Sequence, residues 1–161
     1  EEAGYDGTPI RFMTTQEYLY HYQPSVVAQQ QLEAVGFAVD METVDWATLV
    51  DRRSDPDAYD VFSYSSVFQP DPAMLGFLQL CNWPGWWCSD PSRELMDQLL
   101  EESDVEVRQE VWSQLQATFY EEVPMIKVGD VLNVSALSSQ VRGFTLQTQL
   151  GEFFWNTWLE E

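Results

Sequence analysis

The sequence has very little positive charge. Seven basic residues stand against 27 acidic ones in 161 positions, the formal net charge is −20, and Lys127 is the only lysine. An electrostatic field of this sign repels nucleic acids and anionic membrane surfaces, which argues against both as partners. The acidic residues are scattered and lack the spacing of a calcium-binding loop. They are therefore interpreted as a solvated surface, with a site for several cations as the alternative.

Long apolar runs are also absent. No stretch of the sequence approaches the ~20 apolar residues that span a bilayer, so no direct membrane insertion is expected. The first residues, EEAGYDGTP, do not resemble a signal peptide, and any targeting signal is expected upstream of this chain. An apolar content of 45%, with 14% aromatic residues, predicts a folded domain with a sizeable core.

Motifs for catalysis and for metal binding are nearly missing. His21 is the only histidine, and there is no GxSxG, HExxH, P-loop or GxGxxG pattern in the context that each motif needs. Cys81 and Cys88 lack the CxxC spacing of a redox site and are too few, beside one histidine, for a zinc site. No enzyme activity, metal or cofactor is expected. His21, in the segment YLYHY, is interpreted as an ordinary packing or surface residue, with a ligand contact as the alternative.

The first half of the chain alternates between strand and helix patterns. Three segments have the β-branched, aromatic and alternating apolar residues that are typical of strands: 9–15, 37–42 and 59–66. Between them, the periodicity predicts a helix that Ser25 caps and Gly36 ends, and a short helix that Asp45 caps. Two successive β-α-β units imply parallel strands with right-handed connections. The predicted fold class is α/β, with three layers.

The second half is predicted to be mainly helical. A long irregular connection contains a short helix near residues 73–80, and two longer helices follow it. Ser103 and Glu106 have the spacing of a capping box for the second of these helices. Residues 125–137 then return to a strand-like pattern. No repeat, low-complexity tract or linker divides the chain, so residues 1–161 are predicted to form a single domain.

A binding site is predicted from the topology. Ligands of open parallel sheets sit beyond the carboxyl ends of the strands, where the loops are free of the packing that fixes the sheet. Here those loops, residues 14–23 and 64–71, are rich in aromatic and hydroxyl groups, which suit a moderately polar ligand such as a peptide or a sugar. The alternative is that the rings only cover the edge of the sheet. The candidate ligand contacts are Tyr18, Tyr20, Tyr64, Phe68 and Gln69.

The order of these segments resembles a known family. The pattern GTPIRFMTT … SVVAQQQLEAVGFAVDMETVDWATLVDRR … YDVFSYSSVFQPDP is similar to the second lobe of the extracellular solute-binding proteins of ABC importers, family 5, the dipeptide, oligopeptide and nickel-binding group. The resemblance covers about 140 of the 161 residues. The matched positions are Leu32 with Gly36, Asp45-Trp46, Tyr59-Asp60, Asp71-Pro72, Asp97, Leu99-Leu100, Arg108, Gln116, Pro124, Val141 and Gly143.

The resemblance implies a three-layer α/β/α lobe of the type II periplasmic-binding-protein-like fold, with a mixed, mainly parallel sheet. Residues 1–161 would be most of the second lobe, and C-terminal strands would lead back to a missing first lobe. The implied function is that of the substrate-binding component of an ABC importer, which captures a solute between two lobes and delivers it to a membrane permease. The implied location is periplasmic or at the cell surface, with a signal peptide upstream.

A stand-alone interaction or sensory module that reuses this fold is the alternative function. In either case no catalysis is implied. An isolated lobe offers half of a clamp, so we expect it to bind solute weakly. We also expect it to form a dimer through the surface that the first lobe would cover.

One departure from the family concerns the ligand. The peptide-binding members have an aspartate three residues before the acidic residue of the D/E-P pair, and it holds the amino terminus of the peptide by charge-assisted hydrogen bonds. Counting back from Asp71 gives Phe68, which cannot pair with an ammonium group. Capture of a free amino terminus is therefore not expected, unless Asp71 takes over this role. The expected ligand is a modified peptide, an oligosaccharide or another solute that stacks on aromatic rings.

The segment CNWPGWWC, residues 81–88, is expected to be a stapled aromatic loop. The extracytoplasmic location that the resemblance implies permits oxidation, and the proline and glycine let the chain fold back to bring two sulfur atoms together. A Cys81–Cys88 disulfide is predicted, with two buried free thiols as the alternative. The three tryptophans cannot all be buried in so short a loop. One is expected to face the ligand or a partner, and Trp86 is the candidate.

Overall fold

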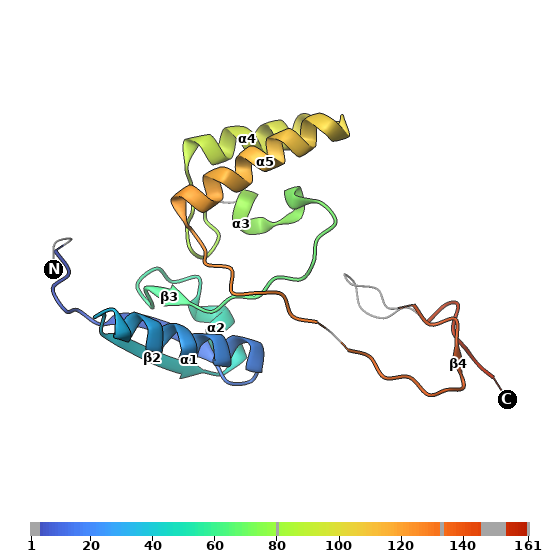
Figure 1. Cartoon of the computed structure of the whole chain (residues 1–161), viewed down its shortest axis with the longest axis horizontal. Helices are drawn as coiled ribbons and strands as arrows, with labels where there is room; N and C mark the ends of the chain where they lie inside the picture. Colours follow the sequence, from blue (N-terminus) through green and yellow to red (C-terminus); the bar gives the residue numbers. More distant parts are fainter. Residues whose placement is uncertain (1–3, 80, 133, 146–153, 161) are drawn as a thin grey trace.

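The chain divides into a sheet body (residues 10–62), a helical body (residues 72–122) and a C-terminal segment (residues 123–160), as Figure 1 shows. The structure is a computed structural model, and it describes residues 4–79, 81–132, 134–145 and 154–160.

Three parallel strands form the centre of the sheet body. Their order is β2 (Val39–Val44), β1 (Ile10–Thr15) and β3 (Val61–Phe62), so β1 lies between the other two. Phe12 of β1 is in register with Met41 on one side and with the first residue of β3 on the other. The last four residues of β1 are buried, as expected for the central strand of a covered sheet.

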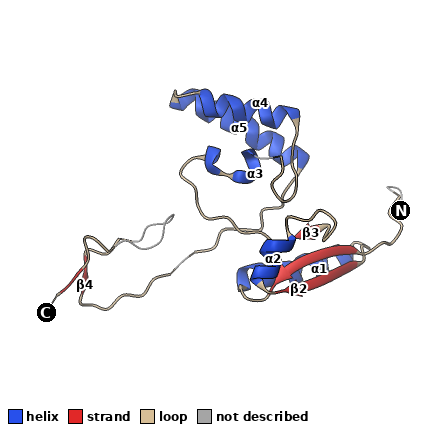
Figure 2. Ribbon diagram, turned by 180° about the vertical axis from the view of Figure 1, so that it is seen from behind, coloured by secondary structure: helices blue, strands red, loops and turns tan. Residues whose placement is uncertain are grey.

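Two helices cover opposite faces of this sheet. α1 (Leu19–Ala34) packs on the face of Thr14, whose hydroxyl group is hydrogen-bonded to the helix. α2 (Trp46–Arg52) packs on the face of Met13, which is buried in one cluster with Leu49. Successive residues of a strand point to opposite faces, so the two helices and the sheet make three layers. The predicted α/β fold with a parallel sheet is therefore confirmed (Figure 2).

The helical body has a core of its own. A short 3-10 turn, η1 (Pro72–Met74), and α3 (Gly76–Gln79) lead to the adjacent helices α4 (Asp90–Glu101) and α5 (Val105–Glu122). Ser89 caps α4 by accepting a hydrogen bond from the N–H of Ser92. The buried residues of this core are Leu78, Met96, Leu99, Val111 and Leu115.

α1 begins earlier than its sequence pattern predicts. It starts at Leu19 and contains Pro24, so Ser25 lies inside the helix and is not its cap. Proline has no N–H to donate to the helix, which makes this position unfavourable. His21 and Ser25 are both buried against the sheet, and their packing stabilises the additional turns.

The cap of α5 is also one residue from its predicted position. Asp104, and not Ser103, is the N-cap residue, and its carboxylate accepts hydrogen bonds from the N–H groups of Glu106 and Val107. The capping box predicted from Ser103 and Glu106 is therefore wrong. An aspartate satisfies the same free N–H groups and adds a negative charge at the positive end of the helix.

Two predicted strands differ from the structure. β3 contains only two residues of the predicted 59–66, because the chain leaves β1 after one more hydrogen bond, from the N–H of Ser63 to the carbonyl of Met13 (3.0 Å). The described part of residues 125–137 contains no strand. A strand needs a neighbouring edge to pair with, and this segment leads away from both bodies (Figure 1).

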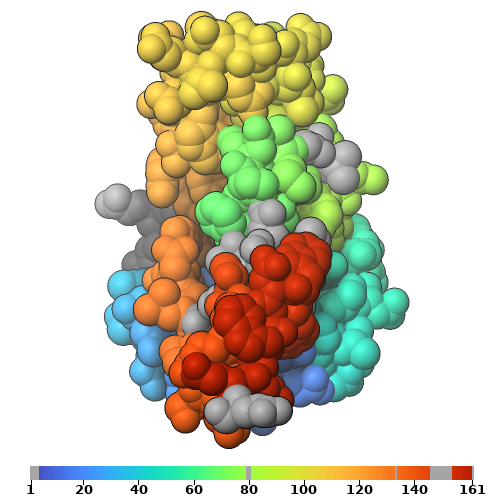
Figure 3. Space-filling view, turned by 90° about the vertical axis from the view of Figure 1, so that its right-hand side faces the viewer, coloured from blue at the N-terminus to red at the C-terminus, as the bar shows by residue number. Residues whose placement is uncertain are grey.

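The C-terminal segment carries apolar side chains on its surface. Ile126, Leu132 and Val134 are 80%, 87% and 92% exposed. The segment ends in an antiparallel pair, β4 (Val141–Arg142) with β5 (Trp158–Leu159), which is separate from the parallel sheet. In Figure 3 this segment, orange to red, faces the viewer, with the helical body at the top and the sheet body below. None of the described helices is long and apolar enough to span a membrane.

Candidate functional site

Aromatic rings gather where β1 ends and α1 begins. Tyr18, the N-cap residue of α1, stacks on Tyr20 with ring centroids 5.4 Å apart, and it meets Trp46 edge-on at 5.1 Å. Tyr18 and Tyr20 remain 36% and 43% exposed. Such rings, held on one side and open on the other, offer a flat apolar surface with hydroxyl groups at its rim. We call Tyr18, Tyr20 and Trp46 the aromatic group.

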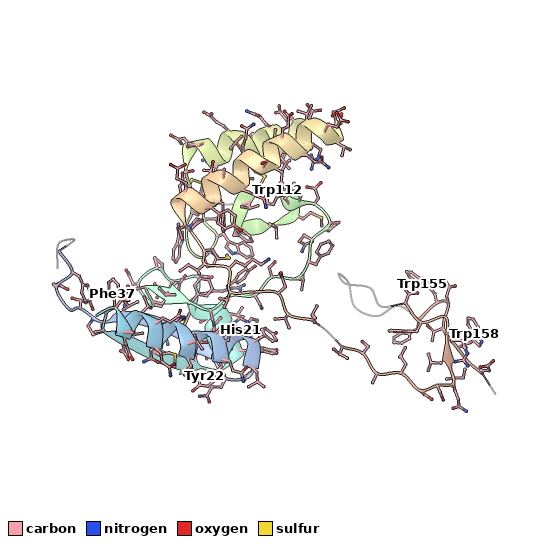
Figure 4. The ribbon with its side chains drawn as sticks, in the orientation of Figure 1. His21, Tyr22, Phe37, Trp112, Trp155 and Trp158 are labelled. Carbon is pink, nitrogen blue, oxygen red and sulfur yellow. A yellow bond between two sulfur atoms is a disulfide. The ribbon has the colours of Figure 1, made fainter. Side chains whose placement is uncertain are left out.

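A buried set of polar side chains lies beside the aromatic group. Nδ1 of His21 is 3.0 Å from Oγ of Ser63, and Nε2 is 3.0 Å from Oγ of Ser65. Oγ of Ser63 is 3.0 Å from Oγ1 of Thr14, which accepts a hydrogen bond from Ser25 (3.0 Å). Figure 4 labels His21 at the start of α1. These five residues, the hydroxyl network, join α1 to the carboxyl ends of β1 and β3.

Burial favours the neutral form of the His21 imidazole. Its side chain is 2% exposed, and burial lowers its pKa below the ordinary value of 6.5. Desolvation disfavours the charged form, and the two groups that bond the ring are hydroxyls rather than carboxylates. The imidazole therefore donates one hydrogen bond and accepts another, so both of its nitrogen atoms are satisfied.

Acidification is expected to destabilise the protein through His21. Between pH 7 and pH 5 the unfolded chain takes up a proton on this imidazole more readily than the folded chain, so the free energy of unfolding falls as the pH falls. Urea unfolding at both pH values should show this fall in the wild type. His21→Gln has no imidazole to protonate and keeps every other charge. The free energy of unfolding should therefore fall less with pH in this variant, and the difference between the two proteins gives the contribution of the imidazole. An equal pH dependence in both would contradict the assignment.

The segment from Ser63 to Asp71, here named the ligand loop, is held at both ends. The hydroxyl network fixes its start. At its end, Oδ2 of Asp71 accepts a hydrogen bond from Nη2 of Arg108 (2.6 Å), and Oδ1 accepts one from the N–H of Ala73 (2.8 Å). Between these anchors Phe68 is 66% exposed. The loop is therefore fixed at Ser63 and Asp71 and exposes the apolar side chain of Phe68 between them.

A disulfide joins Cys81 and Cys88, as the sequence predicts, with their Cα atoms 4.8 Å apart. Arg93 of α4 places Nη1 3.7 Å and 3.9 Å from the two sulfur atoms. Inside this loop Trp86 has a φ of 47°, in the left-handed region that side chains of this size rarely adopt. The disulfide closes the loop and so limits the backbone conformations open to Trp86.

Each tryptophan of the disulfide loop contacts a different part of the chain. Trp83 covers Gly76, where a Cβ atom would come within 2.6 Å of the indole ring. Trp86 stacks on Tyr59 of the sheet body at 6.1 Å, and 36% of its surface is exposed. Trp87 packs edge-on against Phe119 of α5 at 5.4 Å. The loop therefore links the core of the sheet body to the core of the helical body.

The structure brings some of the predicted contacts together and separates others. Tyr18 and Tyr20 form one group. Tyr64 points elsewhere, toward Phe77 and Trp83, with ring centroids 6.4 Å and 6.3 Å away. Phe68 and Gln69 lie on the ligand loop, and Trp86 lies on the disulfide loop. Whether any of the six touches a ligand stays a prediction.

Sequence reasoning missed four residues of this region: Trp46, Thr14, Ser63 and Ser65. A weak signal for the two serines existed, because residues two apart at a strand end point to the same side. His21 and Ser25, four apart, likewise share one face of a helix. The predicted topology places both pairs near the carboxyl ends of the strands, but it does not say which side chains contact one another.

His21 and Ser65 have the spacing of a base and a nucleophile, but the rest of a hydrolase site differs. In serine hydrolases a carboxylate stabilises the imidazolium that forms, whereas here Ser63, a neutral hydroxyl group, bonds the second nitrogen. The ring is thus held between two neutral hydroxyl groups. Among the described residues there is no group of three or more His, Cys, Asp or Glu that could hold a metal ion.

Comparisons with known proteins find similar proteins by sequence and by structure. No family model matches the chain. A probable peptide ABC transporter periplasmic-binding protein of Sinorhizobium fredii is 24% identical over 154 residues, which is 89% of this chain and 29% of the relative. A dipeptide-binding protein of Pseudoalteromonas in complex with Met-Leu superposes with a TM-score of 0.80 and 20% identity, over 99% of this chain and 34% of its own.

A third similar protein is DppA of Helicobacter pylori in complex with the peptide STSA, with a TM-score of 0.76 and 16% identity over 99% of this chain and 33% of its own. The chain thus spans about a third of the length of the proteins that it matches. The resemblance expected from the sequence is confirmed: over that part, the chain is similar in sequence to a probable peptide ABC transporter periplasmic-binding protein and has the fold of a dipeptide-binding protein and of a periplasmic binding protein in complex with a peptide.

Proposed function

We propose that this chain is most of the second lobe of a two-lobed solute-binding protein, which captures an extracytoplasmic solute and delivers it to the permease of an ABC importer. The observation that carries this proposal is the superposition on a dipeptide-binding protein over 99% of the chain. The matched relative is described as periplasmic, which supports a location outside the cytoplasmic membrane. The proposed role is non-catalytic.

The C-terminal segment supports the proposal that a further lobe exists. Its apolar side chains, such as Leu132 and Val134, are almost fully exposed in this chain. Apolar surface of this extent is normally covered by a partner. We assign that role to the first lobe of the same protein. In an isolated chain the same surface favours a dimer.

The ligand contacts that we propose lie at the carboxyl ends of the strands, on the adjoining loops and, for Trp86, on the disulfide loop. The aromatic group supplies the stacking surface, and the hydroxyl groups near it supply hydrogen bonds. The proposed contacts are Tyr18, Tyr20, Tyr64, Phe68, Gln69 and Trp86.

Asp71 does not serve as an anchor for an ammonium group in this proposal. Both of its carboxylate oxygen atoms are already hydrogen-bonded, one to Arg108 and one to the N–H of Ala73. Phe68, three residues earlier, carries no charge. The ligand is therefore bound without a salt bridge between its amino terminus and the ligand loop.

Calorimetry on the whole protein that contains this chain tests both statements. We expect N-acetyl-Met-Leu, whose amino terminus is blocked, to bind at least as tightly as Met-Leu. An anchored ammonium group would contribute about 1.5–3 kcal/mol, so its loss would weaken binding by roughly tenfold or more. Tight binding of Met-Leu that acetylation weakens tenfold would contradict the proposed ligand class.

A pair of tyrosine variants tests the proposed site in the same experiment. Tyr20→Ala removes an exposed ring of the aromatic group and is expected to weaken binding of N-acetyl-Met-Leu about tenfold, because a stacked ring contributes on the order of 1 kcal/mol beyond its buried area. Tyr120→Ala removes a ring that is 68% exposed on α5 and should leave the affinity unchanged. Equal effects of the two changes would contradict the site.

A further inference from the structure

Ser65 is an exposed residue whose hydroxyl group is hydrogen-bonded to a buried side chain, the imidazole of His21. It follows β3 at the start of the ligand loop, and its Oγ lies 3.0 Å from Nε2 of His21. From His21 the contacts continue inward to Ser63, Thr14 and Ser25. A line of hydrogen bonds therefore runs from the surface of the candidate site to the interior of α1.

The protons of this line can be arranged in two ways. In the first, Thr14 donates to Ser63, and Ser63 donates to Nδ1 of His21. Nε2–H of the imidazole then donates to Ser65, whose own O–H is left to donate outward. In the second, Nδ1–H donates to Ser63, and Ser65 donates to Nε2. Its outward side then offers only lone pairs. The imidazole is neutral in both.

We propose that Oγ of Ser65 contacts the bound solute directly and that His21 is a positioning residue, which holds this hydroxyl group and sets whether it donates to the solute or accepts from it. The inference rests on the proposed function and adds the chemistry of the recognised group. A hydroxyl group that can switch direction fits an uncharged polar group such as an amide or a sugar hydroxyl. It does not select for an ammonium or a carboxylate.

The neighbouring serine provides a matched control. Ser66 is also exposed, but its hydroxyl group donates to the carbonyl of Val67, the next residue, at 3.2 Å. It has no link to the hydroxyl network. The two serines thus have the same chemistry and neighbouring positions, and they differ in whether a buried residue orients them.

Ligand binding by the whole protein tests the contact of Ser65. Ser65→Ala is expected to weaken binding of N-acetyl-Met-Leu threefold to tenfold, the effect of losing one neutral hydrogen bond of about 0.5–1.5 kcal/mol. Ser66→Ala should change the affinity less than twofold. An unchanged affinity in Ser65→Ala, or an equal loss in both variants, would overturn the contact.

Hydrogen exchange tests the role of His21 without any ligand. His21→Phe keeps a ring but breaks both hydrogen bonds to the loop, and we expect the amide of Ser63, which donates to the carbonyl of Met13, to exchange at least tenfold faster. His21→Gln, which keeps a donor and an acceptor, should restore slow exchange and most of the affinity. Unchanged exchange in His21→Phe would overturn the positioning role.

The two experiments also separate this inference from the proposed function. If the wild-type protein binds neither peptide, the proposed function and the Ser65 contact both fail, while the exchange result still decides whether His21 positions the loop. If the wild type binds and Ser65→Ala binds equally well, the inference fails alone.

Discussion

Replacing Arg108 with methionine is expected to lower the free energy of unfolding by about 2–3 kcal/mol, because one hydrogen bond to a charged group contributes about 1.5–3 kcal/mol and the contributions of several that share one guanidinium do not add. The guanidinium of Arg108 joins three segments. It donates to the carboxylate of Asp71, to the carbonyl of Leu99 and to the carbonyl of Glu102, the last at 3.0 Å. Methionine keeps the length of the side chain and removes every donor.

The loss should exceed that of an ordinary surface ion pair. The side chain of Arg108 is 21% exposed, so its partners would be left partly desolvated and unpaired. Two of these partners are carbonyl groups at the end of α4. They accept no hydrogen bond from a backbone N–H group of the helix, so they need another donor. Urea unfolding of Arg108→Met and of Gln109→Ala, an exposed neighbour, measures the difference. A loss below 1 kcal/mol in Arg108→Met would show that the contacts are not maintained in solution.

The same change should weaken ligand binding. Asp71 ends the ligand loop, and without Arg108 its carboxylate keeps only the hydrogen bond from Ala73. A loop fixed at one end samples more conformations, so the entropy lost on binding increases. Calorimetry with N-acetyl-Met-Leu, at a temperature where the variant is folded, measures this effect.

Changing both cysteines, Cys81→Ser with Cys88→Ser, is expected to cost about 2.5 kcal/mol of stability, the chain-entropy value for a closed loop of this length. The loop carries the contacts that join the two cores, since Trp86 stacks on Tyr59 and Trp87 packs on Phe119. We therefore expect the unfolding transition to become broader, because the sheet body and the helical body lose part of their coupling.

Reduction of the wild-type protein provides the control for this double variant. Urea unfolding in the presence of a thiol reductant should reproduce the midpoint of the serine variant, because both remove the same covalent link. An unchanged midpoint in both would show that the disulfide does not constrain the unfolded chain.

Local patterns were sufficient to predict much of this fold. The alternation of apolar residues gave the strand that became β2, and Asp45 caps α2 by accepting a hydrogen bond from the N–H of Thr48, as predicted. The disulfide followed from two cysteines in a loop with proline and glycine, together with the resemblance. Each of these features depends on residues that are near one another in the sequence.

The remaining features depend on residues that are far apart. Arg108 and Asp71 are 37 positions apart, and His21 is 42 positions from Ser63. Their residue types are common on any surface, and only the packing of α1 and α5 brings them together. The early start of α1 has the same origin, since burial of His21 outweighs the unfavourable Pro24. Tertiary contacts of this kind leave no periodic pattern in the sequence.

The tryptophan content of the disulfide loop has a practical consequence for optical spectroscopy. Three of the seven tryptophans of the chain lie in this loop, and each has a distinct neighbour: Arg53 over the ring of Trp83 at 5.9 Å, Tyr59 beside Trp86, and the carboxylate of Glu122 bonded to Nε1 of Trp87. Much of the indole emission therefore arises at the joint between the two bodies. The wavelength and the quenching of this emission should therefore change when the contacts between the sheet body and the helical body change, even while both cores remain folded.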